Sequence, residues 1–354
     1  MLCCQISKFR TFYLKLLAGL TIVISTSGLA QPNIVNVYSW TAYIPQQVVK
    51  QFTKETGIRV NLSEYDSNET MYAKLRASSQ AGYDIVLPSN YFVHRMLSQN
   101  MLIPIDKSKI SNFKYLNPTL LNKPFDPNNT YSIPYLASIT GIVVNKDYID
   151  PKTTQSWQSL WQERFRDRLL ILDDMREVFS MALLTLGYSI NDTNPEHIRA
   201  AYLKLKALTP NIKIFNSDIE QNIYVDEDAV IGMGWNGDIN LSKMENPKLE
   251  FIYPQEGFVI SLDCLVITKN AKHLENAYRF INFLLRPDIA KQVSLEVGYT
   301  SPNLGAIKLM SKAEQENPVM NPSAKILSHS TMQEDVGKQL PLYEKYWEML
   351  KIGD

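Results

Sequence analysis

Cysteine is scarce in this sequence, with Cys3, Cys4 and Cys264 in 354 residues. The first two precede an apolar run instead of following one, so they do not form a lipoprotein cleavage site. Without the first thirty residues, Cys264 has no partner for an internal disulfide, and stability must come from a sizeable hydrophobic core. Because Cys264 lies in an apolar run, we interpret it as a small buried side chain and not as a nucleophile.

Histidine is also rare, and its spacing matches no metal site. The zinc, serine-hydrolase and P-loop patterns are absent from the sequence. We therefore expect no catalytic residue, no metal and no cofactor. The four histidines are interpreted as surface or packing residues: His94, His197, His273 and His329.

Acidic residues are absent before Glu55, whereas Lys8, Arg10 and Lys15 precede an apolar run over residues 16–24. This run is short for a membrane span, and small residues up to Ala30 offer a cleavage site. The pattern predicts a secretory signal peptide over residues 1–30, with an N-terminal anchor helix as the alternative.

The charges elsewhere exclude two kinds of partner. The whole chain is neutral, and loss of the three N-terminal basic residues leaves a formal charge near −3. This balance argues against a nucleic-acid partner and against an anionic membrane surface. The length favours two domains over one.

Short apolar runs alternate with amphipathic segments, which is typical of βαβ units and predicts an α/β fold with parallel sheet. Helices are expected after Pro45 up to Gly57, and from Ser67 or Asn68, either of which could cap, to residue 75. Further helices are predicted at 92–97, 195–208, 277–285, 289–297 and 341–350, and strands at 34–40, 58–62, 83–87, 131–135, 142–145, 169–172, 212–215, 229–233 and 258–268.

Aromatic and hydroxyl residues follow the ends of predicted strands. In open α/β sheets ligands bind outside the carboxyl ends of the strands. These side chains therefore indicate a binding crevice: Trp40, Thr41, Tyr43, Ser89 and Tyr91.

An acidic pair, Asp174 and Glu177, lies where the strand at 169–172 gives way to a helix. Residues three apart on a helix lie side by side, so both carboxylates would point the same way. One interpretation is a ligand site at the strand end. The other is that Asp173 or Asp174 caps the helix and Glu177 is solvated.

The glycines at 232, 234 and 237 formally match the dinucleotide-binding G-x-G-x-x-G pattern. That motif should open a helix near the start of a nucleotide-binding domain. Here it lies past the middle of the chain, with Trp235 in the turn and a polar segment over 238–246 behind it. We prefer the interpretation that these glycines allow tight turns and close approach to a ligand.

Carboxylates and aromatics remain as the chemistry of the sequence. Asp263 lies in an apolar strand, where a charge is costly unless paired. Acids with aromatic walls suit an organic cation, because ammonium groups gain charge-assisted hydrogen bonds and cation–π contacts. The set comprises Asp174, Glu177, Asp238 and Asp263 with Trp40, Tyr43, Tyr91, Trp235 and Tyr299.

The sequence resembles a known family across nearly all of the chain after residue 30. It resembles the periplasmic spermidine/putrescine-binding proteins of polyamine ABC importers. The segments that carry the resemblance are WTAY (40–43), QFTKETG (51–57), SNETMYAKL (67–75), NKPFDPNN (122–129), YSIPY (131–135), DMREVF (174–179), INFLLRP (281–287) and GY (298–299).

The resemblance implies a type II periplasmic-binding-protein fold with mixed, mainly parallel sheets and a ligand cleft between two lobes. The expected lobes are residues 31–139 with 263–307 and residues 140–262 with 308–354. It also implies a periplasmic location, a polyamine ligand and an inner-membrane ABC permease as partner. The family's binding residues fall on Trp40, Thr41, Tyr43, Ser89, Tyr91, Asp174, Glu177, Ser217, Trp235, Asp263, Tyr299 and Gln333, of which Ser217 and Gln333 come from the resemblance alone.

Two positions depart from the spermidine-preferring pattern of the family. Ala42 stands where an acid is expected, and Ser261 stands where an aromatic is expected. Asp238 instead resembles the putrescine-specific branch, and we add it to the expected binding residues. Tyr91 fits the spermidine branch, so both ligands stay open.

Two other functions stay open as alternatives. A surface or sensor protein could keep this fold and signal the bound polyamine. A nucleotide-dependent oxidoreductase could use the glycine pattern that begins at Gly232.

Overall fold

The computed structural model describes residues 33–77, 82–217 and 220–352, so the predicted signal peptide lies outside the described residues. No helix among them is long and apolar enough to span a membrane. The strands are β1 (Ile34–Trp40), β2 (Arg59–Tyr65), β3 (Ile85–Val86), β4 (Ser132–Asn145), β5 (Leu169–Ile171), β6 (Ile212–Phe215), β7 (Ile231–Trp235), β8 (Leu249–Ile252), β9 (Phe258–Ile267) and β10 (Ser330–Met332).

Helices connect most of these strands. They are α1 (Gln46–Thr56), α2 (Asn68–Ala77), α3 (Asn90–Ser98), α4 (Met175–Thr185), α5 (Pro195–Leu208), α6 (Glu220–Val225), α7 (Asn236–Glu245), α8 (Leu274–Leu284), α9 (Pro287–Val297), α10 (Leu304–Leu309), α11 (Lys312–Gln315), α12 (Ala324–Leu327) and α13 (Leu340–Ile352). Helix α1 ends at Gly57, whose φ of 71° is a left-handed conformation that favours glycine.

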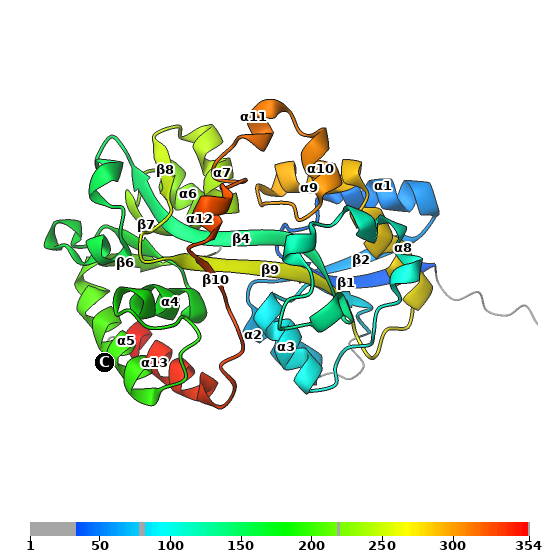
Figure 1. Ribbon diagram of the computed structural model, residues 1–354, viewed down its shortest axis with the longest axis horizontal. Coiled ribbons are helices and arrows are strands. Elements are labelled where there is room, and N and C mark those ends of the chain that lie inside the picture. The colour runs from blue at the N-terminus through cyan, green and yellow to red at the C-terminus, as the bar shows by residue number, and fades with distance from the viewer. Residues whose placement is uncertain (1–32, 78–81, 218–219, 353–354) are drawn as a thin grey trace, which may run out of the picture. The chain divides into compact units, whose positions relative to one another are not determined.

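All of the described strands join in one sheet, in the order β2-β1-β3-β9-β4-β7-β5-β6, with β10 beside β9 and β8 beside β4. Strands β1, β2 and β3 pair in parallel at one end, and β5, β6 and β7 pair in parallel at the other. The long strands β4 and β9 are antiparallel to each other and connect these two ends (Figure 1). The expected α/β fold with mixed, mainly parallel sheet is therefore confirmed.

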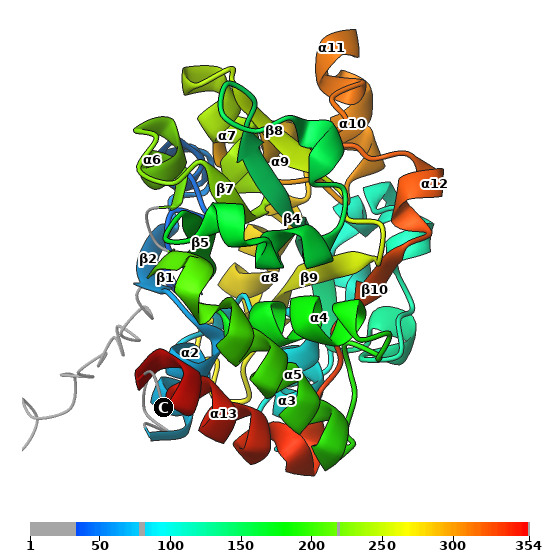
Figure 2. The same cartoon turned by 90° about the vertical axis from the view of Figure 1, so that its left-hand side faces the viewer.

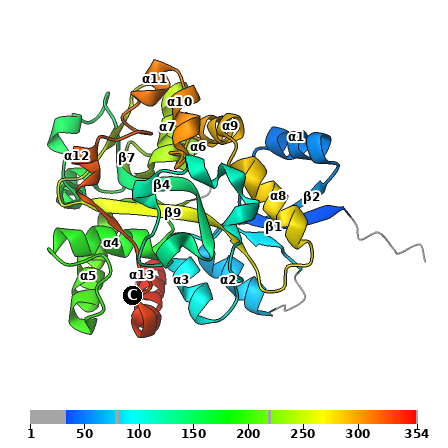
Figure 3. The same ribbon diagram turned by 45° about the vertical axis from the view of Figure 1, so that its right-hand side comes forward.

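The strand period of two separates the cores at the β1–β3 end. Val35 and Val37 of β1 pack in a cluster with residues of α1, α8 and α9, whereas Tyr38 packs in another with residues of α2 and α3. Alternate side chains of a strand point to opposite faces, so helices cover both faces of these strands (Figure 3).

The β5–β7 end repeats this arrangement. Leu169 and Ile171 of β5 belong to a cluster with residues of α4, α5 and α13, and Leu170 between them belongs to a cluster with residues of α6, α7 and β8. Figure 2 shows α13 alongside α5, next to α4. A parallel sheet covered on both faces explains why the strand at 169–171 is apolar at every position.

One prediction of local structure was incomplete, and one segment carried no prediction. The runs at 131–135 and 142–145 are parts of one strand, β4, in which all 14 residues are buried. The polar segment at 238–246 is mostly helix α7, which packs on the core through Ile239 and also buries the polar side chains of Asn236 and Ser242. Tertiary packing explains both differences, because neither segment shows its structure by local periodicity.

Candidate functional site

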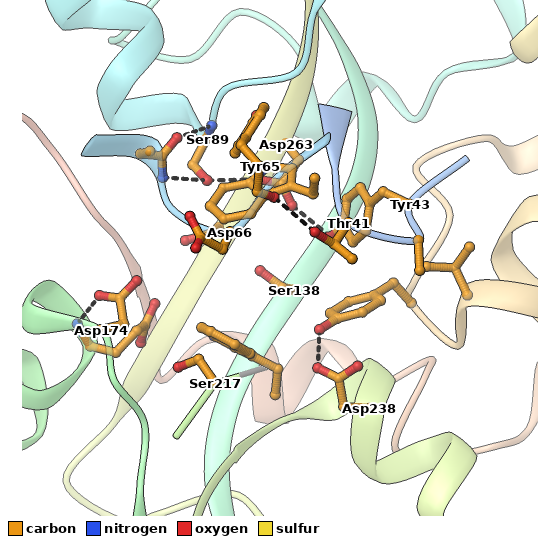
Figure 4. Close-up of a pocket in the computed structure, with 18 of the residues that line it drawn as sticks. Thr41, Tyr43, Tyr65, Asp66, Ser89, Ser138, Asp174, Ser217, Asp238 and Asp263 are labelled. Atoms are coloured by element: carbon orange, nitrogen blue, oxygen red, sulfur yellow. Dashed lines mark hydrogen bonds between the residues drawn. The ribbon is translucent and has the colours of Figure 1, made fainter. Parts of the chain in front are cut away.

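A pocket of about 580 Å³ lies where β4 and β9 pass between the two ends of the sheet, with Ser138 of β4 and Ser261 of β9 in its lining. Figure 4 shows Asp174 on one side of it and Asp238 on another, with Ser138 between them. All thirteen residues predicted for the site line this pocket: Trp40, Thr41, Tyr43, Ser89, Tyr91, Asp174, Glu177, Ser217, Trp235, Asp238, Asp263, Tyr299 and Gln333.

Asp174 and Glu177 hold the start of α4, and the two interpretations of this pair prove compatible. Asp174 caps the helix, because its Oδ1 accepts a hydrogen bond from the Glu177 N–H at 3.0 Å. Glu177 is not solvated: it is 5% exposed, and its Oε2 accepts from the Thr140 hydroxyl at 2.7 Å. Asp174 therefore caps the helix, and both side chains line the pocket.

Burial controls the protonation of this pair. Desolvation, followed by the charge of Asp174, raises the pKa of the Glu177 carboxyl. Desolvation also raises the pKa of Asp174, while its hydrogen bond from the Glu177 backbone lowers it in part. The hydrogen bonds and charges around the pair do not fully offset the free-energy cost of burying two ionised carboxylates. A cationic ligand would offset the rest of that cost.

Asp263 is the buried acid of β9, with 4% of its surface exposed. Two hydroxyl groups satisfy it: the Tyr43 Oη donates to Oδ2 and the Ser89 Oγ donates to Oδ1, each at 2.7 Å. Desolvation outweighs these hydrogen bonds and raises its pKa to about 6. The carboxylate of Asp263, which lies in an apolar strand, is therefore stabilised by hydrogen bonds from uncharged donors.

Asp238 lies in the first turn of α7, where the helix dipole favours a negative charge. The Tyr299 hydroxyl donates to its Oδ2, and the Gln221 amide donates to its Oδ1 at 2.7 Å. Asp238 is the third carboxylate site of the pocket, after the Asp174–Glu177 pair and Asp263, and we call these three sites carboxylate stations. Its hydrogen bond from Tyr299 joins α7 to the loop that follows α9.

Aromatic rings form walls between these stations. Trp40 is fixed by its indole N–H, which donates to the Leu87 carbonyl at 2.9 Å, and it packs on Tyr65 with ring centroids 4.8 Å apart. The rings of Tyr43 and Tyr299 lie 5.4 Å apart. Because Trp40 and Tyr43 lie at the carboxyl end of β1, the expectation of aromatics at strand ends agrees with the fold.

The predicted polar residues are held by local hydrogen bonds. The Thr41 hydroxyl donates to the Tyr65 carbonyl at 3.2 Å, and the Gln333 amide donates to Glu177 Oε1 at 3.3 Å. Ser217 accepts from the Asp173 N–H through its Oγ at 2.9 Å.

Asn68 is a pocket residue that the sequence did not predict. It is 3% exposed and donates to both the Ser89 hydroxyl and the Tyr91 hydroxyl at 3.2 Å. Ser67, and not Asn68, takes the capping role, because its Oγ accepts from the Thr70 N–H. The sequence predicts Ser67 or Asn68 as the cap because both residue types favour that position. The preference for capping does not predict that the Asn68 side chain points into the pocket.

Other lining residues were also missed, since they carry no pattern that points to a ligand. Ala42 and Ser261 were noted only as departures from a family pattern. Ala42 has a left-handed φ of 57°, and its N–H donates to Glu64 at 2.9 Å. The remaining unpredicted residues are Tyr65, Asp66, Ser138, Gln221, Leu241, Glu296 and Val297.

The glycine pattern at 232–237 serves packing. A Cβ on Gly232 would lie 1.9 Å from the Leu170 carbonyl oxygen, and a Cβ on Gly237 would lie 2.3 Å from the Tyr299 ring. Helix α7 does begin at this turn, but the space that a phosphate would need beside Gly237 is filled by Tyr299. The preferred interpretation, close approach, therefore holds in a more specific form. Gly232 allows close contact with strand β5, and Gly237 allows close contact with the ring of Tyr299 in the pocket lining.

The electrostatics of the lining are one-sided. It contains six acids, Asp66, Asp174, Glu177, Asp238, Asp263 and Glu296, and none of the described lining residues is Lys, Arg or His. The described residues also contain no group of three or more His, Cys, Asp and Glu placed to hold a metal ion. Acids without a resident cation, flanked by rings, are suited to an organic cation.

A two-ended α/β sheet with such a pocket at the crossing of its connecting strands defines a solute-binding protein. The chain belongs to the family of bacterial extracellular solute-binding proteins, whose model matches residues 47–322. Its structural neighbours include two-lobed periplasmic binding proteins, and this chain has that fold.

Named relatives extend over almost the whole chain. The spermidine/putrescine-binding periplasmic protein of Salmonella typhimurium is 47% identical over 95% of this chain and 96% of its own length. The putrescine-binding periplasmic protein of Escherichia coli is 34% identical over 88% of this chain and 89% of its own. A putative spermidine/putrescine ABC transporter structure from Listeria monocytogenes has a TM-score of 0.88 at 35% identity and covers 91% of this chain and 100% of its own.

Proposed function

We propose that this chain is a periplasmic substrate-binding protein that captures a polyamine, spermidine or putrescine, and delivers it to an ABC permease. The observation that carries this proposal is the pocket lining, with six acids, aromatic walls and no basic side chain among its described residues. Capture needs no bond-making step.

Each part of such a ligand has a counterpart in the pocket. Ammonium groups would bind the stations at Asp174 with Glu177, at Asp263 and at Asp238, where burial strengthens charge-assisted hydrogen bonds. Methylene segments would pack on Trp40 and Tyr43. The thirteen predicted residues are therefore proposed as the ligand-binding set, and the relatives named for spermidine and putrescine binding support this choice.

The lobes, the export signal and the permease belong to the same proposal. We place the lobes at 31–139 with 263–307 and at 140–262 with 308–354, supported by the change of hydrophobic cluster between Ala137 and Ile142 along β4. Cleavage near Ala30 would release the chain into the periplasm. The closed form would then dock on the permease.

Calorimetry with spermidine, putrescine and the monoacetylated forms of both tests the function. We expect both free polyamines to bind, and acetylation to weaken binding because it removes one charge that the carboxylates recognise. Native mass spectrometry of freshly purified protein should detect a retained small cation. Absence of binding to every amine would overturn the proposal, and loss of polyamine uptake on gene deletion would identify a transporter and not a sensor.

A further inference from the structure

Arg176 occupies an unfavourable place for a cation. It lies between Asp174 and Glu177 in the first turn of α4, where the helix dipole disfavours positive charge. It is also 1% exposed, and a buried charge is costly unless it is paired. In the described part of the chain it forms no salt bridge with any carboxylate. Because the position destabilises the fold, the presence of an arginine there needs an explanation other than stability.

The guanidinium is held by neutral acceptors instead. Its Nη1 donates to the Glu334 carbonyl at 2.9 Å, and its Nη2 donates to the Ile190 carbonyl at 3.3 Å and to Asn191 Oδ1 at 3.2 Å. The buried Nε has no hydrogen-bond partner. The full positive charge is thus fixed in place and is not neutralised by an adjacent acid.

The contacts of Arg176 also brace the pocket. Asn191 bonds to Met332 and Glu334 as well as to the guanidinium, so the pair fixes both neighbours of Gln333. Gln333 in turn donates to Glu177. The ring of Tyr91, a pocket residue of α3, lies 5.6 Å from the guanidinium carbon.

We propose that Arg176 is a positioning residue: its buried guanidinium, held by Glu334 and Asn191, keeps Gln333 and Tyr91 against the pair Asp174 and Glu177 and places one positive charge in the same helical turn. The inference rests on the proposed polyamine-binding function and concerns the same site. The charge of Arg176 favours the ionised form of the pair, so less free energy is needed to release its proton when an ammonium group binds. Selectivity for charged amines follows.

Several other groups act on this pair and belong in the test. The titratable groups around the pair and Arg176 are Asp173 on the preceding turn, Glu69 on α2, Tyr91 on α3, and Tyr343, Glu344 and Lys351 on α13. Lys351 is the other cation of this set, and it is paired with both carboxylate oxygens of Asp173. The positive charge of Arg176 lowers the pKa of both carboxyls of the pair against the raising effect of burial.

The experiment compares Arg176→Met, which removes the charge, with Arg176→Lys, which keeps it. Tyr343→Phe is the matched control, because it deletes a buried hydrogen bond to Asp192 on the ring that faces the guanidinium and alters no charge. Spermidine affinity is measured from pH 5 to pH 9. We expect Arg176→Met to weaken binding at least tenfold at pH 7 and to approach wild type at pH 9, because each unit of raised pKa is a factor of ten.

Arg176→Lys should restore most of the affinity at pH 7, and Tyr343→Phe should lower the melting temperature without moving the pH profile. Carbon-13 NMR titration of the side-chain carboxyls in ligand-free protein adds a readout that needs no ligand: the Glu177 titration should move upward in Arg176→Met and return in Arg176→Lys. Equal weakening at every pH, or an unmoved NMR titration, would overturn the role of Arg176. If wild type bound no polyamine while the NMR titration moved as stated, the proposed function would fail and the role of Arg176 would stand.

Discussion

The three carboxylate stations differ in the groups that already satisfy them. Asp263 accepts two hydroxyl hydrogen bonds, Asp238 accepts from a phenol and an amide, and Glu177 accepts from one hydroxyl and one amide. None of these donors is charged, so each carboxylate keeps its capacity to bind an ammonium group. Substitution of each acid therefore tests a separate part of the ligand.

Asp263→Asn should weaken polyamine binding by more than about 1.4 kcal/mol, or tenfold, because it removes charge from a desolvated site. The shape of the side chain is conserved, so the loss reports charge. Asp66→Asn is the control: Asp66 also lines the pocket but is exposed, and its replacement should change affinity by less than half that amount. Calorimetry of both variants decides, and unchanged affinity in Asp263→Asn would remove this acid from the site.

Asp238→Ala tests whether this acid takes over the amine that Ala42 cannot hold. We expect weaker binding of putrescine and of spermidine by about tenfold, as for loss of one buried charged hydrogen bond. Asp226→Ala, an exposed acid beyond α6, serves as the control for net charge. Affinity equal to wild type for both ligands would contradict this assignment.

Binding should depend on pH in a direction set by burial. Burial raises the pKa of Asp263 to about 6, so below that pH the ligand-free protein carries a proton on this acid. An amine that binds there must displace this proton, which weakens binding. We expect affinity to fall about tenfold from pH 7 to pH 5, with proton release visible as a dependence of the calorimetric heat on the buffer. The ligand-free fold has the opposite trend: this group makes it less stable as pH rises from about 4 to 6, because the unfolded chain loses the proton first. Asp263→Asn should remove the share of both trends that this acid contributes, while Glu177, whose pKa burial also raises, keeps its own.

At the scale of elements, one side chain at the start of α4, Asp174, both caps the helix and lines the pocket. Asp174→Asn keeps a capping oxygen but loses the charge, whereas Asp174→Ala loses both. We expect Asn to preserve the melting temperature while weakening polyamine binding about tenfold, and Ala to lower the free energy of unfolding by a further ~1 kcal/mol. Thermal unfolding and calorimetry separate the two roles. Wild-type affinity in Asp174→Asn would leave Asp174 as a cap only.

Much of the fold was predictable because most elements carry their own signal. Strand β1, helix α5 and strand β6 have the predicted bounds, since apolar period and flanking Pro or Asn mark them locally. Strand β4 was predicted only at its two ends and helix α7 was not predicted, because their burial comes from partners distant in the chain. The site shows the same limit: residues with charge or rings were found, but Asn68 and Gln221 act through neutral amides that look like ordinary surface residues.

At the scale of the molecule, two buried asparagines fix the crossing between the ends of the sheet. Asn236 accepts from the Ile139 N–H of β4 at 2.8 Å and donates to the Val319 carbonyl at 3.0 Å. Asn90 accepts from the Leu262 N–H of β9 at 3.1 Å and donates to the Gln333 carbonyl at 2.5 Å. Both are fully buried. Each asparagine thus links a helix at one end of the sheet to a connecting strand and to a segment nearer the C-terminus.

A ligand that bridges Asp263 at one end and the Asp174–Glu177 pair at the other gains contacts only when the ends approach each other. Differential contact is what shifts a conformational equilibrium. We expect small-angle scattering to show a smaller radius of gyration with saturating spermidine than without it. Asp174→Asn and Asp263→Asn, measured at a spermidine concentration that saturates wild type but not these variants, should stay near the ligand-free value. If saturated wild type kept the ligand-free radius, binding would occur without closure, and the permease would have to recognise a feature other than a closed form.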